Sequence, residues 1–388
     1  MNKNNINKLN LIINAGSATY KYSLFAGEEK VLHALYQKKS QNEFELYIEK
    51  VKIRLSKAQY ENSLSDFLKR RELKKYFDHN KLNAIGFRVV HGGAIFRQTS
   101  KVSKSVLNKL KQLDDLAPLH NPFARKLIEQ SEKILPNVEK YLIFDTAFHS
   151  TIPEKNWRYA IPKRIADKNN LRRYGFHGTV YSSIVEQLRS QKRLPKKLIV
   201  CHLGGGCSVT AIKDGTSIDT SMGFTPLEGL VMATRAGDID PGLIIYLQKK
   251  LKLSLGELLK LLNNESGLKG LAGSRDMRDV LKKAKNNADA KLALEIFCSR
   301  AAKYIASYIV SLGGIDQIIF SGGIGENSPE VREKICEYLK PFGVKINPRK
   351  NNKSKAGEKI SSIFSRQKIF WMHADEATEM NRTIKNLN

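Results

Sequence analysis

Polar side chains that can face an anion are concentrated in a tight turn near the start of the sequence. The stretch LIINAGSATYKYSLF, residues 11–25, predicts two short apolar strands joined by a loop of small and hydroxyl residues. That loop contains four polar side chains: Asn14, Ser17, Thr19 and Lys21. Because Asn, Gly and Ser also form ordinary turns, this hairpin alone would favour a structural interpretation. Further motifs along the chain favour phosphate binding instead.

Three loops rich in Gly and hydroxyl residues each follow an apolar strand, at residues 14–21, 202–208 and 321–328. Their backbone amides carry little side-chain bulk and can bind phosphate oxygens. For the third loop we predict a strand at 318–320, a turn at 321–325 and a helix that begins with Ser328 as N-cap and Pro329 as first residue. Helix N-termini attract anions, so this junction suits phosphate.

Two common nucleotide motifs are missing from the sequence. Neither the P-loop pattern GxxxxGK[ST] nor the dinucleotide pattern GxGxxG occurs. The three loops therefore favour a nucleotide clamp made by two domains.

A polar stretch without periodicity, SIDTSMGFTPLEGLVMATRAGDIDPG, occupies residues 217–242. Its Arg235 could form a surface salt bridge, which would contribute little to stability. Alternatively, its guanidinium could bind a carboxylate or phosphate through two hydrogen bonds. We favour the second interpretation because Arg88 offers another guanidinium from the first half of the chain. His120 and His177, each taken alone, are more often structural histidines.

Strands are expected to position these polar side chains, and one strand–loop–strand pattern occurs twice in the sequence. LIVCHLGGGCSVTAI, residues 198–212, repeats the strand, small-residue loop and strand of residues 11–25, so two halves of similar design are expected. LNAIGFRVVHGG and KYLIFDTAFHS predict buried strands with polar residues at their C-terminal ends. These strands should bring together four side chains, Arg88, His91, Asp145 and His149.

Helices dominate the later part of the chain. Residues 255–273 predict one amphipathic helix that ends at Gly273. Residues 274–314 predict helices with a loop between them. At 388 residues the chain is long enough for two domains, and 41% hydrophobic residues can supply a core for each.

The formal charge of +28 would attract nucleic acid, anionic membranes or phosphorylated metabolites. Because the basic residues lie in dispersed clusters, we interpret them as solvated surface. The four cysteines, Cys201, Cys207, Cys298 and Cys336, lack the spacing of a zinc site and are expected to be reduced thiols. The sequence shows no signal peptide and no run of roughly 20 apolar residues, so a cytoplasmic protein is expected.

Eight motifs follow one another along the chain: NAGSATYK, FRVVHGG, LAPLHNP, FDTAFH, RRYGFHGT, DTSMGFTPLEG, TRAGDIDPG and GGIGENS. In this order they resemble the motifs of the acetate and propionate kinase family, within the superfamily of actin-like ATPases and sugar kinases. The resemblance implies an α/β fold of two actin-like, ribonuclease H-like domains with an active-site cleft between them. It places the domains at 1–149 and 150–375, the second with the nucleotide site and a homodimer interface, and a C-terminal helix at 376–388 on the first domain.

The resemblance also implies roles for matching residues. Arg88 and Arg235 would bind the carboxylate and the transferring phosphoryl group, His177 would stabilise the transition state, and Asp145 would orient the substrate or metal. Asn14 and Glu376 would hold Mg²⁺, with Mn²⁺ as a substitute. ATP or ADP would contact Ser17, Thr19, Lys21, His202, Gly204, Gly205, Gly206, Asp276, Met277, Arg278, Gly323, Ile324, Gly325 and Asn327. Acetate would be bound by Arg88, Val90, Leu119, His120, Phe176 and Pro226.

The implied reaction is reversible, in-line transfer of the ATP γ-phosphoryl group to acetate, giving acetyl phosphate and ADP. A carboxylate is already ionised at neutral pH, so it needs no general base, and the obstacle is repulsion between two anions. Two arginines, a histidine and Mg²⁺ would offset that repulsion. Propionate or butyrate remains an alternative acid, and a non-catalytic nucleotide or nucleic-acid binder is the alternative of another class. We expect no membrane partner and no specific nucleic acid.

Several positions depart from the family pattern. HLGGG stands where the family has HLGNG, so Gly205 lacks an amide that could bind the nucleotide. We expect Ala94, Ala236 and Tyr181 to remove polar groups close to the site. An active enzyme is still expected, because the four predicted catalytic residues are all present: Arg88, Asp145, His177 and Arg235.

Overall fold

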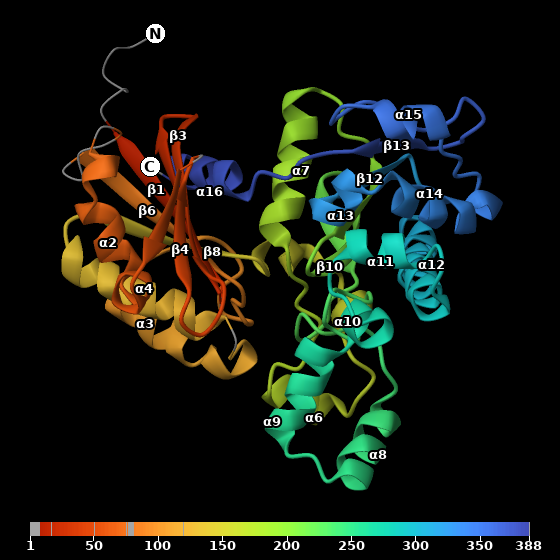
Figure 1. Cartoon of the computed structure of the whole chain (residues 1–388), viewed down its shortest axis with the longest axis horizontal. Helices are drawn as coiled ribbons and strands as arrows, with labels where there is room; N and C mark the ends of the chain where they lie inside the picture. The colour runs from red at the N-terminus through yellow and green to blue at the C-terminus, as the bar shows by residue number, and fades with distance from the viewer. Residues whose placement is uncertain are drawn as a thin grey trace. The chain divides into compact units, whose positions relative to one another are not determined.

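Two units, each with one β-sheet, make up the protein (Figure 1). The structure is a computed structural model that describes residues 8–16, 18–49, 51–74, 76, 81–118 and 120–387. The first unit comprises Met1–Phe148 and Asp375–Asn388, and the second comprises His149–Ala374.

The sheet of the first unit has the order β5-β4-β3-β2-β1-β6-β8-β7. Its strands are β1 (Leu9–Ala15), β2 (Thr19–Ala26), β3 (Glu29–Lys38), β4 (Phe44–Ile48), β5 (Val51–Leu55), β6 (Leu82–Val89), β7 (Ser100–Lys101) and β8 (Glu139–Phe144). β1 pairs antiparallel with β2 and parallel with β6, which in turn pairs parallel with β8. The predicted hairpin at residues 11–25 and the two predicted buried strands are therefore confirmed.

Helices cover both faces of this sheet. They are α1 (Lys57–Glu61), α2 (Ser63–Lys69), α3 (Lys104–Lys111), α4 (Asn121–Ile134) and α16 (Glu376–Lys385). Side chains alternate across β1, so Leu11 packs with the core that includes α2 and α4, whereas Ile12 packs with α16. At Gly86 an added Cβ would lie 2.6 Å from Cδ1 of Ile384, so the missing side chain lets α16 close onto the sheet.

The sheet of the second unit has the order β11-β10-β9-β12-β13. Its strands are β9 (Lys197–Leu203), β10 (Cys207–Lys213), β11 (Thr216–Thr220), β12 (Gln317–Ser321) and β13 (Lys368–Trp371). β9 pairs antiparallel with β10 and parallel with β12, which pairs parallel with β13. This pattern repeats the order β3-β2-β1-β6-β8 of the first unit, so the internal similarity seen in the sequence corresponds to a shared topology.

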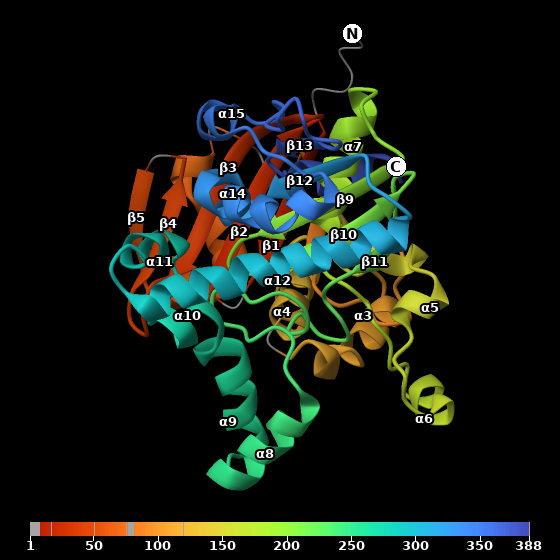
Figure 2. The same cartoon turned by 90° about the vertical axis from the view of Figure 1, so that its right-hand side faces the viewer.

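A long helix, α12 (Ala288–Leu312), lies across this second sheet and contacts β9 and β10 (Figure 2). Its buried residues Ala293, Phe297 and Ala301 are four positions apart and form one face. The other helices of this unit are α5 (Glu154–Trp157), α6 (Lys163–Lys168), α7 (Gly178–Ser190), α8 (Pro241–Leu251), α9 (Leu255–Lys260), α10 (Gly267–Ala272), α11 (Met277–Lys283), α13 (Gly322–Asn327), α14 (Pro329–Tyr338) and α15 (Pro348–Lys353). The predicted helices within residues 274–314 are confirmed as α11 and α12.

The prediction of one helix over residues 255–273 is wrong. α9 continues into a π-helical segment, Leu261–Glu265, and the helix is then interrupted at Ser266, before α10 begins at Gly267. At Gly267, which has a φ of +63°, an added Cβ would lie 2.2 Å from the carbonyl oxygen of Met232. The amide of Leu268 donates to that same carbonyl at 2.9 Å. The helix is therefore interrupted where the backbone of Met232 packs against Gly267.

The prediction of a turn at residues 321–325 is also wrong, because α13 begins directly after β12. Gly322, at a φ of +80°, packs so closely that an added Cβ would lie 2.6 Å from the carbonyl oxygen of Leu203. Its amide donates to Oε1 of Glu326 at 2.9 Å, so the first turn of α13 is capped from within. The next helix does begin at Ser328 and Pro329, as predicted.

All four cysteines are buried and carry free thiols. Burial raises the pKa of Cys207 to about 12, so this thiol stays protonated at neutral pH. In the described ranges, no helix combines the length and the apolar character that a bilayer crossing requires.

Candidate active site

Three neighbouring strands of the first unit bring polar side chains to one edge of its sheet. Arg88 lies near the end of β6, opposite Asn14 of β1, and Asp145 follows β8 directly. Nε and Nη2 of Arg88 donate to the two carboxylate oxygens of Asp145 at 2.9 and 2.5 Å. Nη1 donates to Oδ1 of Asn14 at 3.1 Å. The structure thus confirms that Arg88 and Asp145 lie together.

Opposite charges hold this guanidinium in place. The side chain of Arg88 is 18% exposed and that of Asp145 only 1%, and Oε1 of Glu376 lies 3.5 Å from Nε of Arg88. Burial alone would lower the pKa of Arg88, but the charges of Asp145 and Glu376 raise it above its ordinary value. Arg88 is therefore a permanent, well-oriented cation.

A pocket of about 140 Å³ adjoins this cluster and is lined by Asn14, Lys21 and Glu376, among other residues. Asn14 and Glu376 supply oxygen donors, which Mg²⁺ prefers. Among the residues that the structure describes, no three His, Cys, Asp or Glu side chains form a metal-binding group. Because Mg²⁺ commonly binds through one or two protein oxygens, phosphate and water, two oxygen donors fit the predicted role.

In the second unit, His177 begins α7 in an unusual conformation. Its backbone has a φ of 60° and a ψ of 26°, in the left-handed region that non-glycine residues rarely adopt. Nδ1 lies 2.9 Å from Oγ of Ser208 on β10, and that hydroxyl also hydrogen-bonds Tyr181. The expectation that Tyr181 removes a polar group is therefore wrong, because its hydroxyl joins the contacts that orient His177.

Arg235 and His177 both lie against Gly206. An added Cβ on Gly206 would be 3.3 Å from Nε2 of His177 and 3.6 Å from Nη1 of Arg235. Nη1 of Arg235 donates to the carbonyl oxygen of Pro226 at 3.2 Å and contacts Sδ of Met232 at 3.8 Å. The structure therefore brings together two of the four predicted catalytic residues in this unit.

Arg235 differs from Arg88 in its electrostatic surroundings. In the described part of the chain no carboxylate forms an ion pair with it, and burial lowers its pKa. A partly buried cation of this kind is stabilised when an anion binds. Arg88 and Arg235 thus differ, since the first is paired with a carboxylate and the second is available to a ligand anion.

A larger pocket, of about 670 Å³, lies in the second unit. Eight residues predicted to bind the nucleotide line it: Gly204, Gly205, Asp276, Met277, Arg278, Gly323, Ile324 and Asn327. Four further residues line it that were not named as nucleotide contacts: Ala233, Thr234, Arg275 and Ser328, the last of which ends the predicted phosphate loop 321–328. Thr234, Arg275 and Ser328 each lie next to a selected residue and Ala233 lies two positions from Arg235, so position in the sequence could have identified them.

The remaining predicted nucleotide residues lie near this pocket or in the other unit. An added Cβ on Gly204 would be 3.9 Å from Nε2 of His202 and 3.8 Å from the amide nitrogen of Gly323, so these loops adjoin. At Gly325 it would be 3.5 Å from the carbonyl carbon of Phe320. Thr19 begins β2 in the first unit, and its carbonyl accepts from the amide of Gly16 at 2.8 Å. Ser17 lies outside the described residues.

One rim of the larger pocket carries an ion pair. Asp276 is the N-cap of α11 and accepts a hydrogen bond from the amide of Arg278 at 2.9 Å. The Arg278 side chain also donates to this carboxylate, and together these bonds lower the pKa of Asp276 to about 2. Asp276 is therefore ionised at neutral pH.

The predicted acid-binding residues belong to both units. Val90 follows β6 and His120 precedes α4 in the first unit, whereas the buried Phe176 and the partly buried Pro226 lie in the second. Leu119 lies outside the described residues.

His91 and His149, which the strand pattern predicted beside Arg88 and Asp145, are both buried. The buried His91 accepts from the amide of Gly93 at Nδ1, 2.9 Å away. His149 belongs to the second unit, where Nδ1 lies 2.8 Å from Oγ of Ser217 and Nε2 lies 2.9 Å from the carbonyl oxygen of Phe176. The chain crosses from one unit to the next between Phe148 and His149, which strand periodicity could not reveal.

Comparisons with known proteins extend over almost the whole chain. Residues 9–382 match the Acetokinase family. The chain is 40% identical over 390 residues to the acetate kinase of Brachyspira hyodysenteriae, covering 97% of this chain and 99% of that protein. It is similar to the crystal structure of a propionate kinase from Francisella tularensis, with a TM-score of 0.90 and 38% identity over 97% of this chain and 98% of that one. The Porphyromonas gingivalis acetate kinase gives a TM-score of 0.88 at 32% identity, over 98% of this chain and 100% of that one. These likenesses confirm the predicted α/β fold class.

Proposed function

This chain belongs to the acetokinase family, and on that premise we propose that it transfers the γ-phosphoryl group of ATP reversibly to acetate, giving ADP and acetyl phosphate. The observation that supports the proposal most strongly within the structure is Arg235. Its guanidinium is partly buried, has no acidic partner among the described residues and lies against Gly206 of a glycine-rich loop. Such a group is suited to bind the transferring phosphoryl group.

The residues of both units supply what phosphoryl transfer requires. Acetate is ionised at neutral pH and can attack without a general base, so the barrier arises largely from repulsion between anions. We assign Arg88 to the acid, with Asp145 keeping its guanidinium oriented. We assign Arg235 and His177 to the phosphoryl group, whose negative charge spreads over its oxygens in the transition state.

We propose that Asn14 and Glu376 hold a Mg²⁺ ion, with Mn²⁺ as a possible substitute, on the basis of their oxygen donors beside the smaller pocket. When bound, the ion would neutralise phosphate charge. The nucleotide is assigned to the 670 Å³ pocket, with the base and ribose near Asp276, Met277 and Arg278.

Acetate is the favoured acid because the curated relatives at about 40% identity are named acetate kinases. The test is a coupled assay of ADP release with acetate, propionate, butyrate or no added acid. In a parallel reaction, hydroxylamine traps the acyl phosphate as a hydroxamate. We expect the highest kcat/KM with acetate and stoichiometric hydroxamate. Preference for butyrate would contradict the proposed acid, and ADP release that is independent of any acid would contradict the proposed reaction.

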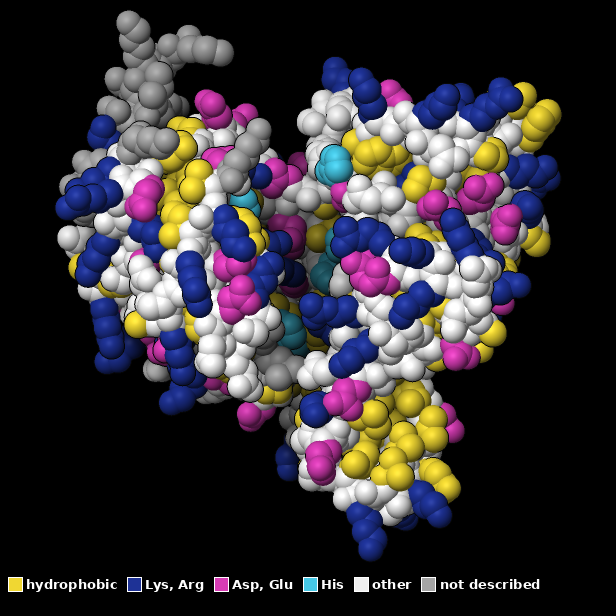
Figure 3. Space-filling model, in the orientation of Figure 1, with side chains coloured by type: hydrophobic (Ala, Val, Ile, Leu, Met, Phe, Trp, Pro, Cys, Tyr) yellow, Lys and Arg dark blue, Asp and Glu magenta, His cyan; other side chains and the backbone are white. Residues whose placement is uncertain are grey.

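We also propose a homodimer formed through the second unit. Hydrophobic side chains gather on the surface near α8 (Figure 3). The exposed apolar residues of α8 and α9 are Leu243, Ile245, Tyr246, Leu251, Leu255 and Leu259. Sedimentation should give a dimer for the parent and a monomer for Leu255→Lys, whose parent side chain is 69% exposed. Val310→Lys, on α12, is the control and should remain a dimer, and a monomeric parent would contradict the proposal. The cytoplasmic location remains a prediction.

A further inference from the structure

Arg235 lies on a long irregular segment. The segment connects β11 to α8 over residues 221–240, hereafter the Arg235 loop, and contains no helix or strand. It also carries Pro226, whose carbonyl oxygen accepts the hydrogen bond from Arg235 at 3.2 Å. Backbone hydrogen bonds hold the part of the loop around Arg235, for example from the amide of Ala236 to the carbonyl oxygen of Leu262 at 3.0 Å, and side chains hold the part that carries Pro226. The side chains that hold this loop next to Pro226 therefore contribute to the position of the Arg235 guanidinium.

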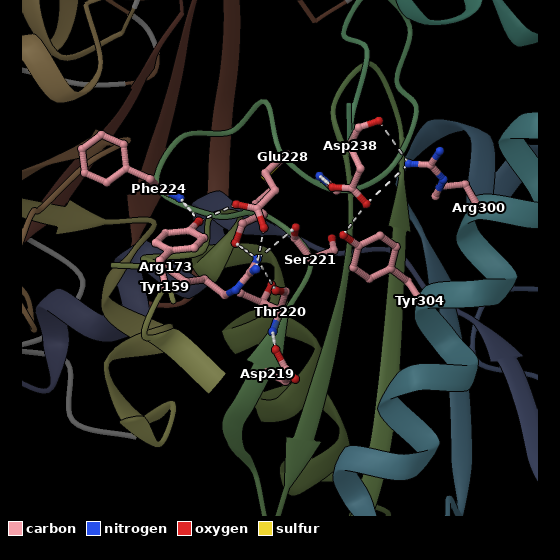
Figure 4. Close-up of polar contacts among 12 residues, drawn as sticks. Tyr159, Arg173, Asp219, Thr220, Ser221, Phe224, Glu228, Asp238, Arg300 and Tyr304 are labelled. Atoms are coloured by element: carbon pink, nitrogen blue, oxygen red, sulfur yellow. Dashed lines mark hydrogen bonds and ion pairs between the residues drawn. The ribbon is translucent and has the colours of Figure 1, made fainter. Parts of the chain in front are cut away.

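Arg173 binds the start of the Arg235 loop. Its Nη1 donates to the backbone carbonyl oxygens of Thr220, Ser221 and Met222, at 3.1, 3.3 and 3.1 Å. Its Nη2 donates to Oε1 of Glu228 at 2.5 Å, as Figure 4 shows. One guanidinium thus joins three successive carbonyls to a carboxylate eight positions beyond the first of them.

Tyr159 connects the same carboxylate to a second point of the loop. Its hydroxyl donates to Oε2 of Glu228, and its oxygen accepts from the amide of Phe224 at 2.8 Å (Figure 4). Both carboxylate oxygens of Glu228 are therefore engaged, one by Arg173 and one by Tyr159. We call Tyr159, Arg173 and Glu228 the Glu228 cluster.

The backbone is adapted to this cluster at Gly223. An added Cβ there would lie 1.6 Å from Oε2 of Glu228 and 2.2 Å from Oη of Tyr159, which no side chain could tolerate. Burial alone would lower the pKa of Arg173, but the charge of Glu228 raises it above its ordinary value. Burial and the same carboxylate raise the pKa of Tyr159, so its hydroxyl remains a donor.

The far end of the loop is fixed separately. Two hydrogen bonds join Gly229 to Asp238. The amide of Gly229 donates to Oδ1 of Asp238 at 2.8 Å, and the amide of Asp238 donates to the carbonyl oxygen of Gly229 at 3.0 Å. Asp238 also accepts from the hydroxyl of Tyr304 on α12 at 2.7 Å, and Arg300 lies 3.4 Å from it (Figure 4). Arg235 lies between Gly229 and Asp238 in the sequence. The Glu228 cluster holds the residue directly before Gly229.

We propose that Glu228, held by Arg173 and Tyr159, is a positioning residue that sets the place of Pro226 and Arg235. The proposal rests on the proposed function, because it assigns the cluster to the step in which the acid receives the phosphoryl group. Loss of the Glu228 charge would release the loop next to Pro226 and misplace the Arg235 guanidinium. A misplacement of about 1 Å can reduce a rate by roughly a hundredfold.

The test compares Glu228→Gln with Glu154→Gln. Glu154 forms an exposed ion pair with Arg158 at 2.6 Å in the same unit and is the matched control. For Glu228→Gln we expect kcat to fall by roughly 10- to 100-fold, whereas KM for ATP, whose pocket is lined largely by other segments, changes less than about threefold. Glu154→Gln should match the parent. Hydrogen exchange should become faster in residues 221–238 of Glu228→Gln and remain unchanged elsewhere.

Three results would overturn the proposal: a kcat of Glu228→Gln within threefold of the parent, a rise in KM for ATP that parallels the loss of kcat, or unchanged exchange in residues 221–238. If Glu228→Gln does not fold, Tyr159→Phe serves as the second variant, because it removes only the hydroxyl that binds Glu228. Its kcat should be about 3- to 10-fold lower than that of the parent. An unchanged kcat would contradict the proposal. A parent that is inactive with every acid would contradict the proposed function instead, and the exchange measurement would still decide the role of Glu228.

Discussion

Replacing each of the two arginines by Met should separate activity from stability. Arg88→Met removes both hydrogen bonds to Asp145, at 2.9 and 2.5 Å, and deprives a carboxylate that is only 1% exposed of its guanidinium. Breaking a buried ion pair in this way costs about 3–5 kcal/mol of unfolding free energy. Arg235→Met removes one bond to the Pro226 carbonyl, at 3.2 Å, and also a charge whose burial is unfavourable. These two effects oppose each other, so the unfolding free energy should change by no more than about 1 kcal/mol.

Turnover should respond alike in the two variants. Each removes a guanidinium assigned to the reacting anions, and loss of such a group lowers kcat by roughly a thousandfold or more, about 4 kcal/mol of activation free energy. Urea unfolding and acid-dependent ADP release measure the two quantities. In the Arg88→Met background, Asp145→Asn should recover at least half of the lost stability and none of the activity. Equal destabilisation by both Met variants, or an Arg235→Met kcat within a few-fold of the parent, would refute the reasoning.

Three further predictions concern other residues. Gly205→Asn adds an amide where a Cβ would meet nothing within 4 Å, so KM for ATP should fall by about 2- to 10-fold in the ADP-release assay, and an unchanged or higher KM would contradict this. Ser208→Ala removes the hydroxyl 2.9 Å from Nδ1 of His177 and should lower kcat roughly 10-fold or more, with a smaller loss for Tyr181→Phe; the reverse order would contradict it. Burial lowers the pKa of His149 to about 4, below its ordinary 6.5. As the pH falls, the unfolded state therefore binds a proton before the folded state does, and the free energy of unfolding should fall by about 3 kcal/mol between pH 6.5 and pH 4. Urea unfolding across that range should show a smaller pH dependence of the unfolding free energy for His149→Gln than for the parent. The same pH dependence in both proteins would exclude His149 as its source.

Local patterns in the sequence predicted much of the fold. The hairpins β1–β2 and β9–β10 were found because apolar runs on either side of small residues indicate strands and a turn. The pairing of Arg88 with Asp145 followed because the ends of parallel strands meet at one sheet edge. These inferences needed only periodicity and a rule of topology.

Contacts between distant segments could not be predicted in this way. The break before α10 depends on Gly267 packing against the backbone of Met232, which the helical pattern of its own segment does not indicate. The Glu228 cluster joins residues up to 69 positions apart. Glu228 belongs to the polar stretch 217–242, but no pattern in the sequence pairs it with Arg173 or Tyr159. The role of the Tyr181 hydroxyl likewise required the position of Ser208 on a separate strand.

The packing of α16 on the first unit has a consequence for biosynthesis. Ile12, Ala84 and Ile143 are synthesised early, yet they share their small core with Met380 and Ile384 of the last helix. A nascent chain therefore exposes that apolar face until α16 has left the ribosome, and domains usually fold as units during synthesis. Glu376 arrives in the same segment, so ribosomal products that stop early would lack both the cover of the sheet and a carboxylate beside Arg88.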